Sequence, residues 1–125
     1  MNRTTNQIIN GKHLYYAFVS GGKHVLKNQN ELNQINVFPV SDKDTGTNLA
    51  STIRSVIDNI KPNKSYKATM TDIADAALIG ARGNSGIIFA QFFYGLNQET
   101  NQIHEITPKE FVKSVKGAIP YIYDA

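Results

Sequence analysis

Residues 49–60 read Leu-Ala-Ser-Thr-Ile-Arg-Ser-Val-Ile-Asp-Asn-Ile, and this stretch has the clearest helical periodicity of the chain. Apolar side chains recur at i, i+4, i+7, i+8 and i+11, a spacing that places them on one face of an α-helix. We expect the helix to begin near Thr45–Asn48 and to stop before Pro62, since proline cannot continue a helix. Its apolar face consists of Leu49, Ile53, Val56, Ile57 and Ile60.

One further helix is predicted before residues 49–60 and one after them. In the earlier helix, Gly21 and Gly22 interrupt the helix at some cost in helix propensity, and their small size allows another helix to approach closely. A shorter helix is predicted from Asp72 to Ile79, with Thr71 as its N-cap. The apolar face of the first helix consists of Leu14, Phe18, Val25 and Leu26.

The second half of the chain predicts two more helices. Residues 84–96 are apolar on nearly every side, which is typical of a helix in the middle of a bundle. The last helix has a strong start signal, because Thr107 and Glu110 form a capping box around Pro108. Its buried face is expected to consist of Phe111, Val115, Ala118 and Ile119.

No segment alternates like a half-buried strand for long, and Pro39 makes the apolar residues 35–40 an extended approach to a loop. The predicted fold is therefore all-α, an antiparallel helical bundle with short functional loops at helix ends.

Composition favours one soluble cytoplasmic domain. The chain has 125 residues, 41% of them hydrophobic and 18% charged, and no cysteine, so thiolate metal sites and disulfides are excluded. No apolar stretch is long enough to span a membrane, and no signal peptide is recognisable. The net charge of +3 comes from scattered lysine and arginine residues, which argues against nucleic-acid binding.

An acidic loop precedes the helix at residues 49–60. Asp42 and Asp44 stand two residues apart, so in an extended loop both carboxylates project to the same side. Carboxylate oxygens without nearby cysteine or histidine suit Mg²⁺. The alternative has equal weight: Asp44 or Thr45 caps the helix, and Asp42 interacts with its dipole.

A glycine-rich loop, Gly80-Ala81-Arg82-Gly83-Asn84-Ser85-Gly86, leads into the apolar fourth helix. Small residues at a helix N-terminus let backbone N–H groups approach a phosphate. Taken alone, an ordinary helix–helix turn capped by Asn84 or Ser85 is the better interpretation. The two loops together, both at helix N-termini and separated by two helices, have the division of labour of a Mg-nucleotide site.

Three segments in order resemble a known family: Ile9–Lys12, the loop from Asn36 to Asn48, and the loop from Gly80 to Gly86. The second resembles the signature of the ATP-binding subunit of bacterial fatty acid kinase. That domain is related to the nucleotide-binding, DhaL-type domain of dihydroxyacetone kinase. The resemblance covers most of residues 1–125, which would form the N-terminal part of such a domain.

The resemblance implies an antiparallel helical barrel, incomplete in this chain, that binds ATP and Mg²⁺ as cofactors. It implies a kinase whose partner subunit holds a fatty acid or a triose, and a homodimer is compatible with it. Asp42, Asp44 and, with less support, Asn36 would be metal ligands. The nucleotide-binding residues would be Thr45, Gly46, Thr47, Asn48, Gly83, Asn84, Ser85 and Gly86.

The chain departs from the family pattern at Ser41 and Lys43, where the family usually has proline and glycine. Lys43 lies between the two carboxylates that would bind the cation. This departure leaves a second interpretation open, a non-catalytic nucleotide-binding or protein-interaction module derived from the same family.

Overall fold

The computed structural model describes residues 7–34 and 44–123. Within these residues the fold is all-α, as predicted, with two very short strands that the sequence did not predict. The elements are β1 (Ile9–Asn10), α1 (Gly11–Lys27), α2 (Gln29–Gln34), α3 (Thr45–Asn59), α4 (Tyr66–Gly80), α5 (Gly83–Gln98), β2 (Glu105–Ile106) and α6 (Pro108–Tyr123). The predicted extended segment at residues 35–40 lies outside the described residues.

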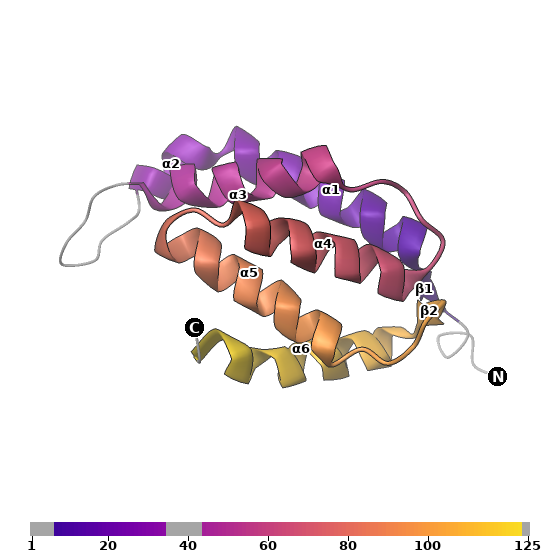
Figure 1. Ribbon diagram of the computed structural model, residues 1–125. Coiled ribbons are helices and arrows are strands. Elements are labelled where there is room, and N and C mark those ends of the chain that lie inside the picture. The colour runs from indigo at the N-terminus through magenta and orange to yellow at the C-terminus, as the bar shows by residue number, and fades with distance from the viewer. Residues whose placement is uncertain (1–6, 35–43, 124–125) are drawn as a thin grey trace.

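The long helices form an antiparallel bundle (Figure 1). Helix α5 lies between α4 and α6 and also packs on α3, while α1 packs on α3 and α4. The central position predicted for α5 is therefore confirmed, although Ile87 and Ile88 on its first turns are each 46% exposed.

The buried residues form two clusters along the bundle. One is built on Val56, Ile73 and Ala90, and Phe18, Phe89 and Phe93 pack around it. The other joins Tyr66, Met70 and Leu96 to Ile106 and Ala118. The first cluster includes Val56 and Ile60 of the face predicted for residues 49–60, and Ile53 of that face is also buried.

Helix α1 runs without a break through Gly21 and Gly22, so the predicted interruption is wrong. A Cβ at Gly22 would lie 2.9 Å from the Cγ2 of Ile53 and 3.0 Å from the Cδ1 of Ile57. The close approach of another helix, which the small residues also predicted, is confirmed. Packing on α3 offsets the low helix propensity of glycine.

Helix α4 begins at Tyr66, earlier than the predicted Asp72, and its N-cap is Ser65 rather than Thr71. The Ser65 hydroxyl accepts a hydrogen bond from the Ala68 N–H at 3.1 Å. Tyr66 and Met70 are fully buried at helical spacing, which continues the helix upstream of the segment that the sequence pattern singled out. The Thr71 hydroxyl instead donates to the side-chain oxygen of Asn97 at 3.2 Å.

The capping box of α6 is confirmed. Glu110 accepts from the Thr107 N–H at 2.8 Å, and Thr107 accepts from the Glu110 N–H at 3.1 Å. Ala118 is buried as predicted, but Ile119 is 41% exposed, so its predicted place on the buried face is wrong. Ser114 is buried instead, and its hydroxyl donates a hydrogen bond to the Phe111 carbonyl.

The Ile9–Lys12 segment stabilises the end of the bundle at which β1 and β2 lie. The strands pair antiparallel with Ile9 opposite Ile106, and the Gly11 N–H donates to the Lys64 carbonyl at 2.8 Å. Asn10 caps α1 in a reciprocal pair of hydrogen bonds with His13. Within the described residues, no helix is long and apolar enough to cross a membrane.

Candidate nucleotide-binding site

The N-termini of α3 and α5 lie together at the end of the bundle opposite β1 and β2 (Figure 1). The Ser85 hydroxyl in α5 donates to the Thr45 carbonyl in α3 at 3.0 Å. The end of the acidic loop and the glycine-rich loop are thus brought to one place, although these two partners lie 40 positions apart in the sequence. The partial positive charge of both helix N-termini is concentrated there, as an anion site requires.

Two glycine residues allow this approach. Gly83 has a φ of 64°, in the left-handed region that suits glycine, and a Cβ there would overlap the side-chain amide of Asn48. A Cβ at Gly86 would overlap the hydroxyl of Thr52. The first turn of α5 therefore rests directly on α3.

Helix α2 caps α3 from outside. The Asn33 side-chain oxygen accepts from the Thr47 N–H at 3.0 Å, and its amide donates to the Thr47 hydroxyl at 2.9 Å. Gly46 fits against α2, because a Cβ there would overlap the Gln29 carbonyl. Sequence analysis missed both α2 and Asn33, since a helix of six residues has no apolar face to reveal it.

Among the described residues, no side chain caps the N-terminus of α5, unlike the N-terminus of α3. The N-cap residue of α5, Arg82, makes no side-chain capping hydrogen bond, and neither Asn84 nor Ser85 takes the capping place considered in the sequence analysis. Gly83 and Asn84 are exposed. Backbone N–H groups of an uncapped first turn are the donors that bind phosphate oxygens at helix N-termini.

The structure describes only the last residues of the acidic loop, from Asp44 onward. Asp44 occupies the N-cap position of α3, but its side chain makes no capping hydrogen bond to the helix. The alternative that Asp44 serves as a side-chain cap therefore gains no support. Asn36 and Asp42, the other predicted metal ligands, lie outside the described residues, so the Mg²⁺ site remains a prediction.

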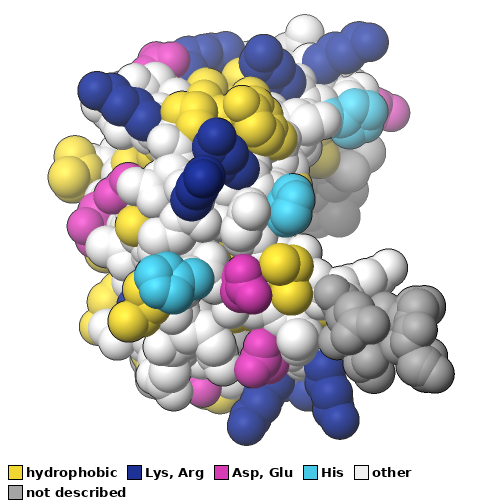
Figure 2. Space-filling view, turned by 90° about the vertical axis from the view of Figure 1, so that its right-hand side faces the viewer, with side chains coloured by type: hydrophobic (Ala, Val, Ile, Leu, Met, Phe, Trp, Pro, Cys, Tyr) yellow, Lys and Arg dark blue, Asp and Glu magenta, His cyan; other side chains and the backbone are white. Residues whose placement is uncertain are grey.

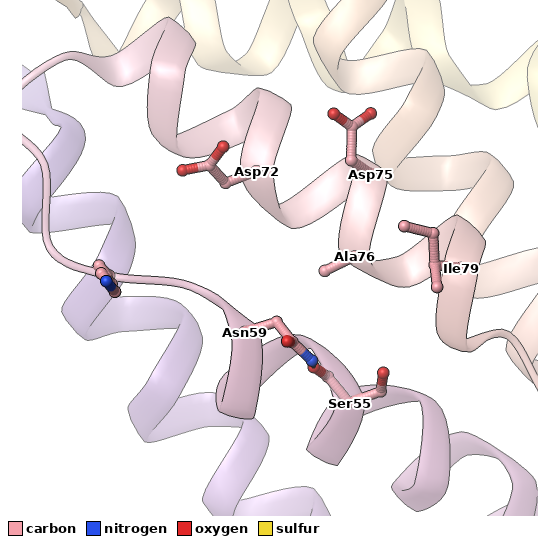
Figure 3. A pocket seen from close by; sticks show the side chains of 7 residues that line it. Ser55, Asn59, Asp72, Asp75, Ala76 and Ile79 are labelled. Atoms are coloured by element: carbon pink, nitrogen blue, oxygen red, sulfur yellow. The ribbon is translucent and has the colours of Figure 1, made fainter.

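A hollow of about 340 Å³, lined by both polar and apolar side chains, lies between α3 and α4, outside the first turns of α3 and α5. Figure 3 shows its acidic side chains, Asp72 and Asp75, projecting from α4 in different directions rather than toward one point. Within residues 7–34 and 44–123, no group of three or more acidic or histidine side chains could hold a metal ion. Asp72 and Asp75 therefore do not belong to such a group.

Positive charge is not gathered at one place on the face that Figure 2 presents. Lysine and arginine side chains lie along its upper and lower parts, with acidic, histidine and apolar side chains between them. This distribution agrees with the scattered basic residues of the sequence and offers no continuous stripe for a nucleic-acid backbone on that face.

The fold and the site define an all-α domain that brings two helix N-termini together at one end of a bundle. Residues 39–125 match the family model of the DAK2 domain, and the chain belongs to this family. DAK2 domains are nucleotide-binding domains of the dihydroxyacetone kinase family.

Several curated relatives come from staphylococci. An uncharacterized protein of Staphylococcus epidermidis is 33% identical over 119 residues, which make up 94% of this chain and 22% of that protein. Uncharacterized proteins of Staphylococcus saprophyticus and Staphylococcus aureus are 31% and 32% identical over the same shares. The chain thus spans about a fifth of the length of the curated relatives it matches.

Proposed function

We propose that the chain is the N-terminal part of a Mg-ATP-binding domain of a phosphotransferase. The observation that carries this proposal is the contact between the first turns of α3 and α5, where the Ser85 hydroxyl meets the Thr45 carbonyl at 3.0 Å. In this chain of the DAK2 family, the described end of the acidic loop and the glycine-rich loop meet at this contact.

The residues at this place fit a polyphosphate. The Thr45 hydroxyl and the side-chain amides of Asn48 and Asn84 are neutral donors near two helix N-termini, while the Ser85 hydroxyl donates to the Thr45 carbonyl and fixes the two N-termini beside each other. The backbone N–H groups that begin at Gly83 add donors without side-chain obstruction. Neutral donors and helix dipoles bind phosphate without adding fixed positive side chains, so the negative charge of the phosphates remains available to a bound cation.

Asp42, Asp44 and Asn36 would hold the cation. All three offer oxygen ligands, and Mg²⁺ takes one or two carboxylates together with phosphate oxygens and water. When bound, Mg²⁺ would neutralise charge on the phosphates during transfer. The protein would contribute mainly positioning, because no described side chain at the site is an obvious general base.

The phosphoryl acceptor would be supplied by a partner subunit or domain that holds a fatty acid or a dihydroxyacetone-like substrate. This part of the proposal rests on the resemblance of the loops to fatty acid kinase and dihydroxyacetone kinase. A homodimer of the nucleotide-binding chain is compatible with that arrangement.

Isothermal titration with ATP, with and without Mg²⁺, tests the proposal. We expect Asp42→Asn and Asp44→Asn each to weaken Mg-ATP binding while the helical circular-dichroism signal stays unchanged. Asp58→Asn is the matched control, since Asp58 is an exposed carboxylate near the far end of α3. Equal affinities for all four proteins would refute the assignment of the metal ligands.

A non-catalytic nucleotide-binding module is the second candidate, and the position of Lys43 between the carboxylates favours it. Lys43→Gly should tighten Mg²⁺ binding if the ammonium opposes the cation, and the gain should shrink at high salt. Formation of ADP in the presence of a fatty-acid-binding or triose-binding partner would identify a kinase. Binding of Mg-ATP without ADP formation would identify the module.

A further inference from the structure

Thr52 lies in the second turn of α3 and is fully buried. Its hydroxyl accepts a hydrogen bond from the Arg82 N–H at 3.0 Å and donates one to the Asn48 carbonyl at 2.9 Å. One side chain therefore joins the backbone of α3 to the residue directly before α5. Because the Thr52 side chain is buried, it contacts the two segments of the candidate site and does not contact a ligand.

The same oxygen occupies the space that a side chain at Gly86 would need. A Cβ at Gly86 would overlap the Thr52 hydroxyl, whereas the Cβ of Thr52 would be 3.4 Å away, an ordinary contact. The position of Thr52 thus explains why residue 86 is a glycine, and this explanation does not require a bound phosphate. Gly86 is buried against α3.

We propose that Thr52 is a positioning residue of the nucleotide site, an inference that rests on the proposed function. Its hydroxyl holds Arg82, and with it the uncapped first turn of α5, at a fixed place beside Asn48. This hydrogen bond is partly buried and ties the Arg82 backbone to α3, so removal of the hydroxyl should loosen the segment that enters α5. The phosphate donors on the two helices would then lose their common geometry.

Thr52→Val removes the acceptor and keeps the shape of the side chain, while Thr52→Ser keeps the acceptor. The matched control is Thr100→Val, because Thr100 is also buried and also donates to a helix carbonyl, that of Leu96, near the other end of α5. Mg-ATP affinity is measured at a temperature at which all variants are folded. Amide hydrogen exchange at Arg82 is measured by NMR on the same samples.

We expect Thr52→Val to weaken Mg-ATP binding about tenfold and to speed exchange at Arg82, as the loss of one partly buried hydrogen bond implies. Thr52→Ser should remain within about twofold of the wild type, and Thr100→Val should lower stability without changing affinity. If Thr52→Val binds like Thr100→Val, the positioning role is refuted and the proposed function stands. If the wild type does not bind Mg-ATP, both are refuted.

A double-mutant cycle tests the steric relation to Gly86. Gly86→Ala should impair folding and binding because its methyl group meets the Thr52 hydroxyl. Combination with Thr52→Ala should recover stability and part of the affinity, and combination with Thr52→Ser should recover neither. The double variant should bind Mg-ATP as well as Thr52→Ala alone; recovery of stability with affinity far below that of Thr52→Ala would contradict the steric account, since it would mean that Gly86 contacts the phosphate directly.

Discussion

Glycine residues in this chain serve different purposes that only the structure separates. Gly83 has a positive φ and lies against Asn48, whereas a Cβ at Gly21 would meet nothing within 4 Å. In the sequence both are glycines next to apolar helical segments. Their surroundings predict opposite effects for the same substitution.

Gly83→Ala should destabilise the protein by about 1–2 kcal/mol from the left-handed conformation alone, and by more from overlap with Asn48. Gly21→Ala should stabilise it by about 0.5–1 kcal/mol, because alanine is preferred inside a helix. Urea unfolding followed by circular dichroism measures both. Equal effects of the two substitutions would contradict this account of Gly83.

Tyr66 carries a buried hydroxyl that has no hydrogen-bond partner among the described residues. Burial raises its pKa to about 12 from an ordinary value of 10.0. The neutral form of the phenol is favoured in the folded state. The free energy of unfolding therefore does not depend on the ionisation of Tyr66 below pH 10, and it falls as the pH rises from 10 through 12. In that window the unfolded chain binds fewer protons than the folded one.

Tyr66→Phe should therefore stabilise the protein by roughly 1 kcal/mol at neutral pH, since it removes an unpaired buried polar group. Its advantage over the wild type should grow between pH 10 and 12. Chemical unfolding of both proteins across this range measures the difference. A difference that stays constant with pH would show that the hydroxyl is solvated.

At the scale of the elements, the sequence predicted best where pattern and local chemistry agree. The periodicity of residues 49–60 and the capping box at Thr107 located α3 and the start of α6. The start of α4 was missed because Tyr66 and Met70 are placed by contacts with Leu96 and Ile106, which are distant in sequence. The continuity of α1 likewise depends on its packing against α3.

The capping box gives a direct test of one element. Thr107→Ala removes the acceptor for the Glu110 N–H and should cost about 1 kcal/mol of stability. Lys109→Ala, an exposed residue in the same first turn, is the control and should change little. Thermal melts of both variants measure the effect, and equal melting temperatures would refute the role of the cap.

At the scale of the molecule, the sequence identified both loops of the candidate site but not the contacts that join them. Ser85, Thr52 and Asn33 connect segments through hydrogen bonds that depend on how α2, α3 and α5 pack. A serine, a threonine and an asparagine have no periodic signal of their own. Sequence reasoning could therefore name the loops and expect them at one end of the bundle, while the hydrogen bonds that join them required the packed structure.

An apolar groove of about 320 Å³ lies between α1, α3 and α5. It is lined by Ala17, Phe18, Gly21, Gly22, Val25, Ile53, Phe89 and Phe93. We expect a longer protein with further helices after residue 125 to bind Mg-ATP more tightly than this chain alone, because such helices would hold both loops in place. Parallel ATP titrations and thermal melts would compare the two. Equal affinities would show that residues 1–125 suffice for binding.

The central claim is that the N-termini of α3 and α5 together bind the phosphates of Mg-ATP. An NMR titration that follows every backbone amide tests it most directly. We predict that the largest shifts fall on residues 45–48 and 83–86, require Mg²⁺, and disappear in Asp44→Asn. Shifts confined to another surface, such as the lysines of α6, or no shift at saturating Mg-ATP, would contradict the claim.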